Sequence, residues 1–313
     1  TTDGGATWLP LWEWGAYPEI IAHFDMDVSS APWLSLDPEA FTAPDKPLKI
    51  GWMMEGLNID PFNADHMMYG TGATLYEVNN LSDWDSGGTV HIASAGRGIE
   101  ETSVLGLVSP QEGAHLASAV GDVGGWVHTD LDTAPALNYR TPDSGTNNDI
   151  DFAADVPATM VRVGAGFAIT YDGGATWNRS WATLPGTAGQ VAINTDGSRI
   201  VWAPGDGAVS VSVNDGGASW TAATGIPQGA AIAADRVNAD VFYGFVGGTF
   251  YVSTNGGASF SATVSTDLPS SGEIHAVPGF EGHVWLAGGA QVTGGSSESD
   301  LDGLWYSTDG GES

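Results

Sequence analysis

The chain has 313 residues, with 38 acidic and 8 basic side chains and a formal charge of −30. Such a surface repels polyanions, so neither nucleic acid nor an anionic membrane is an expected partner. There is no cysteine, which excludes disulfides and cysteine-ligated zinc. The 45 glycines, 16 prolines and 13 tryptophans favour an all-β fold of short strands joined by tight turns.

Short segments of one pattern recur along the chain, at 1–8, 170–177, 213–220, 253–260 and 307–313. Each has Asp or Asn followed by Gly-Gly, and most end on Trp or Phe, which is the pattern of an Asp-box. The acid or amide can bond the N–H groups of its own turn, and the aromatic ring can pack between strands. We therefore assign a structural role and no catalysis to the box aspartates Asp3, Asp172, Asp215 and Asp309. Val213 and Asn255 depart from the usual Ser or Thr and the usual Asp.

The boxes from 170 onward recur at intervals of about 40 to 55 residues, the repeat length of a four-stranded propeller blade. Within one repeat we predict strands at 190–193, 199–203, 209–213 and 218–221. In the next we predict strands at 241–245 and 249–253 around the hairpin turn Gly247-Gly248.

A second internal similarity links 60–70 with 235–244, so we expect the box-free parts to form blades as well. The stretch 289–303, rich in Gly, Ser and acids, is predicted to be a surface loop. The chain opens inside one box and stops one residue short of the aromatic that closes another. We therefore expect neighbouring sequence beyond both ends, or two ends that meet in one blade of a closed ring.

The stretch 118–126 is the candidate site, because it places Asp122 between glycines after a predicted buried strand at 117–120. Gly121, Gly124 and Gly125 would let a bulky ligand approach the backbone, and Trp126 offers a flat ring. A carboxylate beside an aromatic suits a sugar-cleaving site. We expect the apolar neighbours to shield Asp122 from water, which favours a general-acid role. The alternative is a turn aspartate that binds backbone N–H groups.

The chain resembles the glycoside hydrolase family 74 xyloglucanases in its boxes, in the motif at 121–125 and in the segment 57–74. The similarity extends through 32–33, 80–85, 98–102, 202–206 and 275–279. Boxes alone would be unspecific, because sialidases, sortilins and photosystem assembly factors also carry them. Trp126 departs from the phenylalanine or similar residue expected at its position.

The resemblance implies a pair of seven-bladed β-propellers with a substrate cleft between them. It also implies inverting hydrolysis of the β-1,4-glucan backbone of xyloglucan by two aspartates, one of which falls on Asp122 while the other lies upstream of residue 1. Residues 1–85 would be the closing blades of the first propeller and 86–313 most of the second. The implied protein is secreted, is a monomer with its preceding propeller, and acts on xyloglucan or a related plant cell-wall β-glucan.

Several residues are candidates for binding substrate or assisting Asp122. Around Asp122 the substrate-binding candidates are Gly124, Gly125, Trp126 and His128, and elsewhere Trp33, Trp52 and Trp84, with Trp12 and Trp14 as further rings. For each tryptophan, packing in the core is the alternative. We interpret Glu100, Glu101 and His128 as orienting or structural groups rather than as the main acid or base. No His and carboxylate cluster has metal-ligand spacing, so no metal or cofactor is expected.

Two other functions compete with hydrolysis of a neutral glucan. A sialidase needs an arginine cluster for the substrate carboxylate, but the arginines are scattered and the charge of −30 disfavours anionic sugars. A non-catalytic propeller that binds carbohydrate or protein stays open. In it, Asp122 would be a turn residue and the tryptophans a recognition surface.

Overall fold

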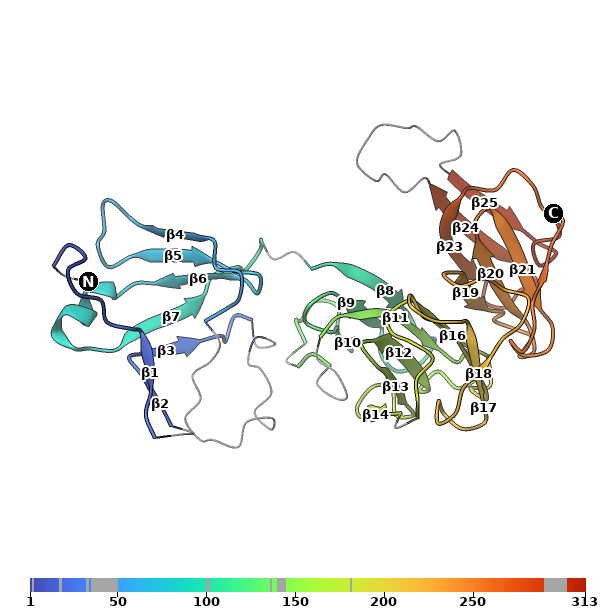
Figure 1. Ribbon diagram of the computed structural model, residues 1–313, viewed down its shortest axis with the longest axis horizontal. Coiled ribbons are helices and arrows are strands. Elements are labelled where there is room, and N and C mark those ends of the chain that lie inside the picture. The colour runs from blue at the N-terminus through green and yellow to red at the C-terminus, as the bar shows by residue number, and fades with distance from the viewer. Residues whose placement is uncertain are drawn as a thin grey trace. The chain divides into compact units, whose positions relative to one another are not determined.

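The computed structural model describes residues 1, 3–16, 19–31, 34, 50–99, 102–135, 137–139, 145–180, 182–289 and 303–313. They form two compact units, Thr1–Glu101 with Ala134–Leu137 (unit 1) and Thr102–Thr133 with Asn138–Ser313 (unit 2). Regular structure in the described ranges is almost wholly strand, apart from a short 3-10 helix, η2 (Leu81–Ser86) (Figure 1). The all-β prediction is confirmed, and the division at residues 85 and 86 stays a prediction.

Unit 1 contains a hairpin and a five-stranded sheet in the order β3-β7-β6-β5-β4. Strands β4 to β7 form an antiparallel meander, and β3 adds to β7 in parallel. Its core is formed around Tyr69 and Tyr76, whose rings stack with centroids 5.1 Å apart. The hairpin is β1 (Trp12–Trp14) and β2 (Ile20–Ala22), and the sheet is β3 (Phe24–Asp27), β4 (Gly56–Ile59), β5 (Met67–Gly70), β6 (Leu75–Val78) and β7 (Val90–Ser94).

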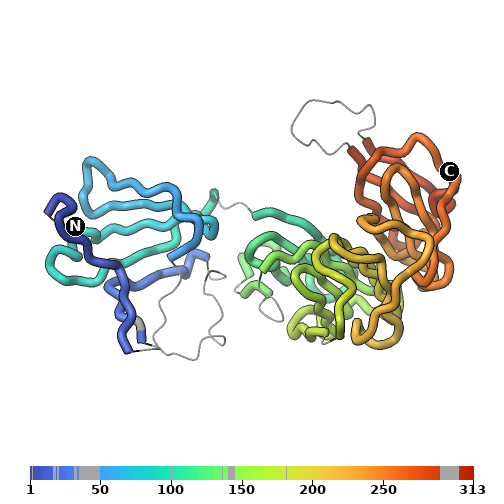
Figure 2. Tube along the Cα trace, in the orientation of Figure 1, coloured from blue at the N-terminus to red at the C-terminus, as the bar shows by residue number. Residues whose placement is uncertain are grey.

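Unit 2 consists of antiparallel sheets that follow one another along the chain, as the colour of the trace shows in Figure 2. The first strands of consecutive sheets contact each other, which is the arrangement of propeller blades around an axis. The sheets are β8 (Val104–Val108), β9 (Leu116–Val120), β10 (Val127–His128); β11 (Asn147–Phe152), β12 (Met160–Gly164), β13 (Phe167–Thr170), β14 (Asn178–Arg179); β15 (Gln190–Ile193), β16 (Arg199–Ala203), β17 (Ser210–Val213), β18 (Thr221–Ala222); β19 (Ala231–Ala234), β20 (Phe242–Val246), β21 (Thr249–Ser253), β22 (Ser261–Ala262); and β23 (Ser271–Ala276), β24 (Val284–Gly289), β25 (Gly303–Ser307).

The predicted strands of the third and fourth sheets largely coincide with the structure. The ranges 190–193, 199–203 and 249–253 are β15, β16 and β21, and 209–213 and 241–245 overlap β17 and β20. The strand at 218–221 is wrong: Asp215 still holds Ala218 and Ser219 in the box turn, so β18 begins only at Thr221. Gly247 and Gly248, at φ 59° and 76°, make the predicted hairpin turn. Most of 289–303 lies outside the described residues.

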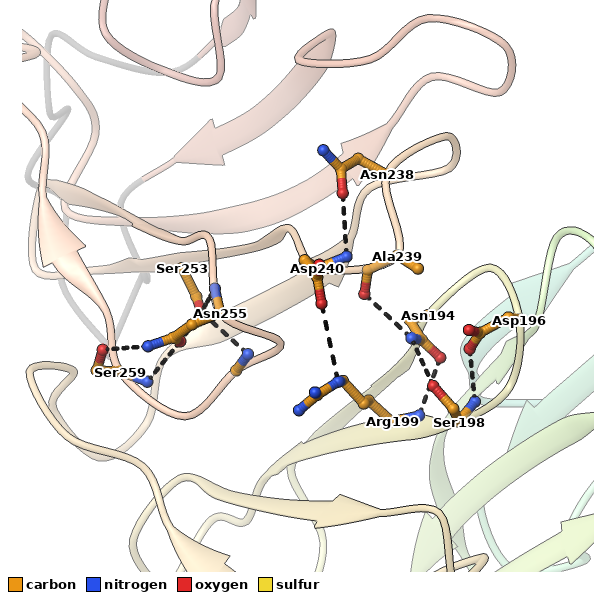
Figure 3. Close-up of polar contacts among 11 residues, drawn as sticks. Asn194, Asp196, Ser198, Arg199, Asn238, Ala239, Asp240, Ser253, Asn255 and Ser259 are labelled. Atoms are coloured by element: carbon orange, nitrogen blue, oxygen red, sulfur yellow. Dashed lines mark hydrogen bonds and ion pairs between the residues drawn. The ribbon is translucent and has the colours of Figure 1, made fainter.

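The box aspartates bind their own turns, in agreement with their predicted structural role. The Asp172 carboxylate accepts hydrogen bonds from the Thr176 hydroxyl (2.6 Å), the Thr176 N–H (2.9 Å) and the Thr170 hydroxyl (2.7 Å). These bonds, led by that of the Thr176 hydroxyl, lower the pKa of Asp172 to about 2. Asn255 serves equally well: its Oδ1 accepts the Ser259 N–H at 3.0 Å and its Nδ2 donates to Ser259 Oγ at 2.8 Å (Figure 3).

The box at 213–220 compensates for its unusual Val213. Ser212, one residue earlier, donates its hydroxyl hydrogen bond to Asp215 and accepts the Gly217 N–H at 3.0 Å. Ser212 and Asp215 are three residues apart, one more than Thr170 and Asp172. Asn214, whose φ is 56°, accommodates the extra residue. Asparagine tolerates this left-handed conformation better than most residues. The departure at Val213 therefore changes the path of the backbone and keeps the contacts of the box.

The similar segments 60–70 and 235–244 fold alike, which supports reading the box-free parts as blades. Each makes the same two turns before an aromatic-rich strand, β5 or β20. The bonds are Phe62 N–H to Asp60 and Val237 N–H to Asp235, both 2.8 Å, and Asp65 N–H to Asn63 and Asp240 N–H to Asn238, both 3.1 Å. In Figure 3 the second turn also meets the preceding sheet, because Asn194 Nδ2 donates to Ala239 O at 3.0 Å.

Side chains join the first strands of neighbouring sheets in unit 2. Strand β15 donates its N–H groups to β11, from Val191 to Asp149 and from Ile193 to Asp151, both at 2.9 Å. Gln190 accepts the Ile232 N–H of β19 at 3.1 Å in the same way. These bonds satisfy backbone donors that an uncovered strand edge would leave unpaired. A cavity of about 550 Å³ lies among β8, β11, β15, β19 and β23.

The junction at Asp149 predicts a pH dependence of stability. Burial raises the pKa of Asp149 from its ordinary 3.8 to about 7, and the charges of Asp151 and Glu273 add to the effect. Between those values the folded protein binds more protons than the unfolded chain, so this group lowers stability as pH rises. Asp149→Asn removes the group. The free energy of unfolding of Asp149→Asn, relative to that of the wild type, should therefore increase from pH 5 to pH 8.

Urea unfolding of both proteins across this pH range measures that difference. The charged groups that face Asp149 are Asp151, Arg236, Glu273 and His275, and all four are present in both proteins. A difference that stays constant with pH would contradict the raised pKa of Asp149.

The box ring Trp220 should be a major packing element of unit 2. It lies edge-on to Phe167 and to Trp202, with ring centroids 5.2 and 5.6 Å apart. Trp220→Ala should lower the free energy of unfolding by about 3 kcal/mol, as large core truncations do. Thermal unfolding measures this loss. Phe280→Ala is the control, because Phe280 is 57% exposed. If Trp220→Ala lowers the free energy of unfolding as little as Phe280→Ala does, Trp220 is not part of the core.

Candidate functional site

The candidate site is the turn that connects β9 to β10. Strand β9 is buried, as predicted for 117–120, and pairs with β8 and β10. The Val120 N–H donates to Gly124 O at 3.1 Å, and the Ser118 N–H donates to Trp126 O at 2.9 Å. These bonds close the turn at its base, so that Asp122 stands at its tip.

The backbone of the turn explains its residues. Asp122 has φ 62°, a left-handed conformation that aspartate adopts more readily than most side chains. Gly125 has φ 125°, and a Cβ placed there would lie 2.0 Å from Ser118 O. Gly124, at φ 84°, is buried like Gly125. Backbone geometry therefore accounts for both glycines, and their contact with a substrate stays a prediction.

The carboxylate of Asp122 is exposed, so the prediction that apolar neighbours shield it from water is wrong. Those neighbours are buried, at 1% exposure for Val120 and 8% for Trp126, but the turn carries the Asp122 side chain out of the strand. Burial therefore gives no reason to prefer the acid over the base role.

The Asp122 carboxylate also differs from those of the box aspartates. Within the described ranges, no hydrogen bond or ion pair reaches its oxygens, and only its backbone N–H is bonded, to Thr146 Oγ1 at 2.9 Å. The alternative role, a turn aspartate that binds backbone N–H groups, is therefore not what the structure contains. The carboxylate is presented to solvent with its acceptor capacity unused.

Trp126 and His128 pack beside the turn. The Trp126 ring is 8% exposed, with its centroid 6.3 Å from that of His128. His128 is half-buried, which lowers its pKa, and its Nε2 lies 3.3 Å from Ser118 Oγ. Both side chains thus take part in packing the base of the turn. Stacking of Trp126 on a sugar, and contact of His128 with one, stay predictions.

The other predicted rings belong to unit 1. Trp84, in η2, is half-buried and lies edge-on to His23 with centroids 5.4 Å apart, so it contributes to the core. Trp52 is half-buried, and its carbonyl accepts the Gly72 N–H at 2.7 Å. Trp12 and Trp14 are 38% and 60% exposed, with centroids 5.6 Å apart. Trp33, Glu100 and Glu101 lie outside the described residues.

Sequence reasoning missed the residues that frame the turn from outside. Asn138 Nδ2 donates to Val123 O at 2.8 Å, and the Tyr139 hydroxyl donates to Trp126 O at 2.9 Å. With Thr146, they come from the segment between β10 and β11. That segment has no repeat or motif that marks it, so no signal in the sequence pointed to these contacts.

No group of three or more His, Cys, Asp or Glu side chains in the described part of the chain could hold a metal ion. Among the same residues, no helix is long and apolar enough to cross a membrane.

No family model matches the chain. A xyloglucanase of Paenibacillus sp. is 46% identical over 325 aligned positions, covering 99% of this chain and 31% of that protein. The xyloglucanase Xgh74A of Acetivibrio thermocellus is 46% identical over 297 positions, covering 92% and 35%. A crystal structure of the GH74 xyloglucanase from Xanthomonas campestris matches with a TM-score of 0.74 at 29% identity, covering 100% of this chain and 49% of that one.

The resemblance to the glycoside hydrolase family 74 xyloglucanases is confirmed. The β-propeller fold class is confirmed with it, because a family 74 structure matches over the whole chain. The chain spans about a third of the length of the curated family 74 relatives that it matches.

Proposed function

We propose that this chain is part of a glycosidase that hydrolyses xyloglucan and that it supplies one of two catalytic aspartates, Asp122. The observation that carries the proposal is the contrast between Asp122 and the box aspartates. The Asp172 carboxylate accepts hydrogen bonds from its own turn, whereas the Asp122 carboxylate is exposed and unbonded among the described residues. A carboxylate free to act on a substrate is what glycoside hydrolysis requires.

The proposed reaction is inverting hydrolysis of the β-1,4-glucan backbone. One carboxylic acid gives its proton to the departing glycosidic oxygen, and one carboxylate takes a proton from the attacking water, with the two groups roughly 6.5 to 9.5 Å apart. We place the second carboxyl in the preceding propeller that the resemblance implies. This chain joined to that propeller is called the two-propeller protein below.

A neutral branched β-glucan suits this chain better than an anionic sugar does. The charge of −30 opposes anionic ligands, and arginines are few. Exposed indoles such as those of Trp12 and Trp14 are the kind of surface on which sugar rings stack. The named relatives are xyloglucanases, which favours xyloglucan among the β-glucans. Since plant cell-wall polymer lies outside cells, we propose an extracellular location.

Titration of the two-propeller protein with xyloglucan oligosaccharides, followed by tryptophan fluorescence and paired with a turnover assay, tests the proposal. We expect saturable binding of these oligosaccharides, hydrolysis of the polymer and no response to sialyllactose. A response to sialyllactose alone would overturn the assigned substrate. Binding of xyloglucan without hydrolysis would instead support a non-catalytic binding propeller.

A further inference from the structure

The tip of the Asp122 turn is held by two side chains that come from the segment after β10. Thr146 Oγ1 accepts the Asp122 N–H at 2.9 Å, and Asn138 Nδ2 donates to Val123 O at 2.8 Å. The two bonds thus clamp the backbone of Asp122 and of the residue that follows it. Both bonds leave the Asp122 carboxylate untouched.

The turn needs this support because its own bonds are short-range. The Val123 N–H donates to Gly121 O at 2.6 Å and the Gly125 N–H donates to Val123 O at 3.1 Å, each spanning only two residues. Asp122 itself has a positive φ, a conformation that persists only when the surroundings stabilise it. Among the described residues, the Thr146 hydroxyl is the acceptor for the Asp122 N–H. The hydroxyl of Thr146 therefore stabilises the conformation that directs the carboxylate outward.

The supporting segment is itself anchored at both ends by Arg162 of β12. The Arg162 guanidinium lies over the Tyr139 ring, 4.7 Å from its centroid, and donates to Asn147 Oδ1 at 2.6 Å. Tyr139 neighbours Asn138, and Asn147 neighbours Thr146. Tyr139 also bonds the turn, through its N–H to Gly125 O at 2.9 Å. Arg162 and Tyr139 are 1% and 4% exposed, so the clamp rests on the buried interior of unit 2.

We propose that Thr146 and Asn138 are positioning residues for Asp122, and that they set the orientation of its carboxylate during hydrolysis. The inference rests on the proposed function of Asp122. A displacement of about 1 Å at a reacting group can lower turnover by about 100-fold. Loss of either hydrogen bond, from Thr146 or from Asn138, should therefore reduce kcat more than it changes KM.

The first test uses the 313-residue chain and needs no activity. Thr146→Val keeps the shape of the side chain but removes the acceptor, so the Asp122 amide should exchange with solvent about 5- to 10-fold faster, as expected for the loss of one hydrogen bond. Thr146→Ser should restore the wild-type rate. Thr187→Val is the matched control, because Thr187 bonds Asp206 at 3.0 Å in another turn. An unchanged exchange rate of the Asp122 amide in Thr146→Val would show that the Thr146 hydroxyl does not hold the turn.

The second test measures xyloglucan turnover in the two-propeller protein. Thr146→Val and Asn138→Ala should lower kcat about 10- to 100-fold with KM within a few-fold, and Thr146→Ser should turn over near the wild-type rate. Wild-type kcat in Thr146→Val, alongside an inactive Asp122→Asn, would overturn the positioning role and leave the proposed function standing. Full turnover by Asp122→Asn would instead overturn the proposed function, and the exchange test would still report on the clamp.

Discussion

Asp122→Asn should lower xyloglucan turnover by the two-propeller protein by about 10² to 10⁴-fold, the usual effect of losing a positioned general acid or base. The amide keeps the size and shape of the carboxylate but cannot exchange the proton. Binding of xyloglucan oligosaccharides should therefore stay within a few-fold of the wild type. Steady-state kinetics give kcat, and tryptophan fluorescence titration gives the binding constant.

Asp172→Asn is the matched control for this experiment. The same substitution is tolerated in a box, since Asn255 makes the corresponding contacts with Ser259. Asp172→Asn should therefore leave turnover unchanged. Wild-type turnover by Asp122→Asn would show that Asp122 is a turn residue without a catalytic role.

The same variant can assign the chemical role of Asp122, which its exposure leaves undecided. If Asp122 is the acid, Asp122→Asn should retain more activity on aryl glycosides than on polymer, because an aryloxide leaves without protonation. If Asp122 is the base, both substrates lose activity alike, because the attacking water is no longer activated.

Gly125→Ala should have the largest effect on stability among substitutions in this turn. The new Cβ would lie 2.0 Å from Ser118 O and 2.9 Å from the Tyr139 ring, at a φ of 125° that alanine rarely adopts. Backbone strain and overpacking together should lower the free energy of unfolding by roughly 3 kcal/mol or more. Because the contacts lie at the base of the turn, the Asp122 tip should shift as well and turnover should fall.

Urea unfolding followed by tryptophan fluorescence measures this loss of stability. Gly166→Ala is the control in the same unit, because nothing lies within 4 Å of a Cβ placed there. It should change the free energy of unfolding by less than about 1 kcal/mol. A similarly small change in Gly125→Ala would show that the turn relaxes easily and is not rigidly held.

The strands and boxes could be predicted from sequence because their signals are local. Strand β15 ends where the polar turn begins, and β21 begins after the two glycines that need positive φ. Each box carries its acceptor, its donors and its glycines within a few residues. Even the departure at Val213 was recoverable in principle, since Ser212 supplies the same hydroxyl one residue earlier.

The environment of Asp122 could not be predicted because non-local contacts determine it. The residues around Asp122 correctly indicated a buried strand, but the direction of its carboxylate depends on a positive φ that aspartate itself adopts. The hydroxyl that supports this conformation belongs to Thr146, in a different segment without a recognisable pattern. Likewise, nothing near Trp126 in the sequence indicates that its ring would be 8% exposed.

We propose that Asp122 is one half of a catalytic pair whose other member lies outside these 313 residues. The most direct test compares xyloglucan hydrolysis by this chain alone with hydrolysis by the two-propeller protein, with NMR to identify the anomer first released. We expect no turnover by the chain alone, and turnover with release of the inverted α-anomer by the two-propeller protein. Xyloglucan hydrolysis by the 313-residue chain alone would contradict it.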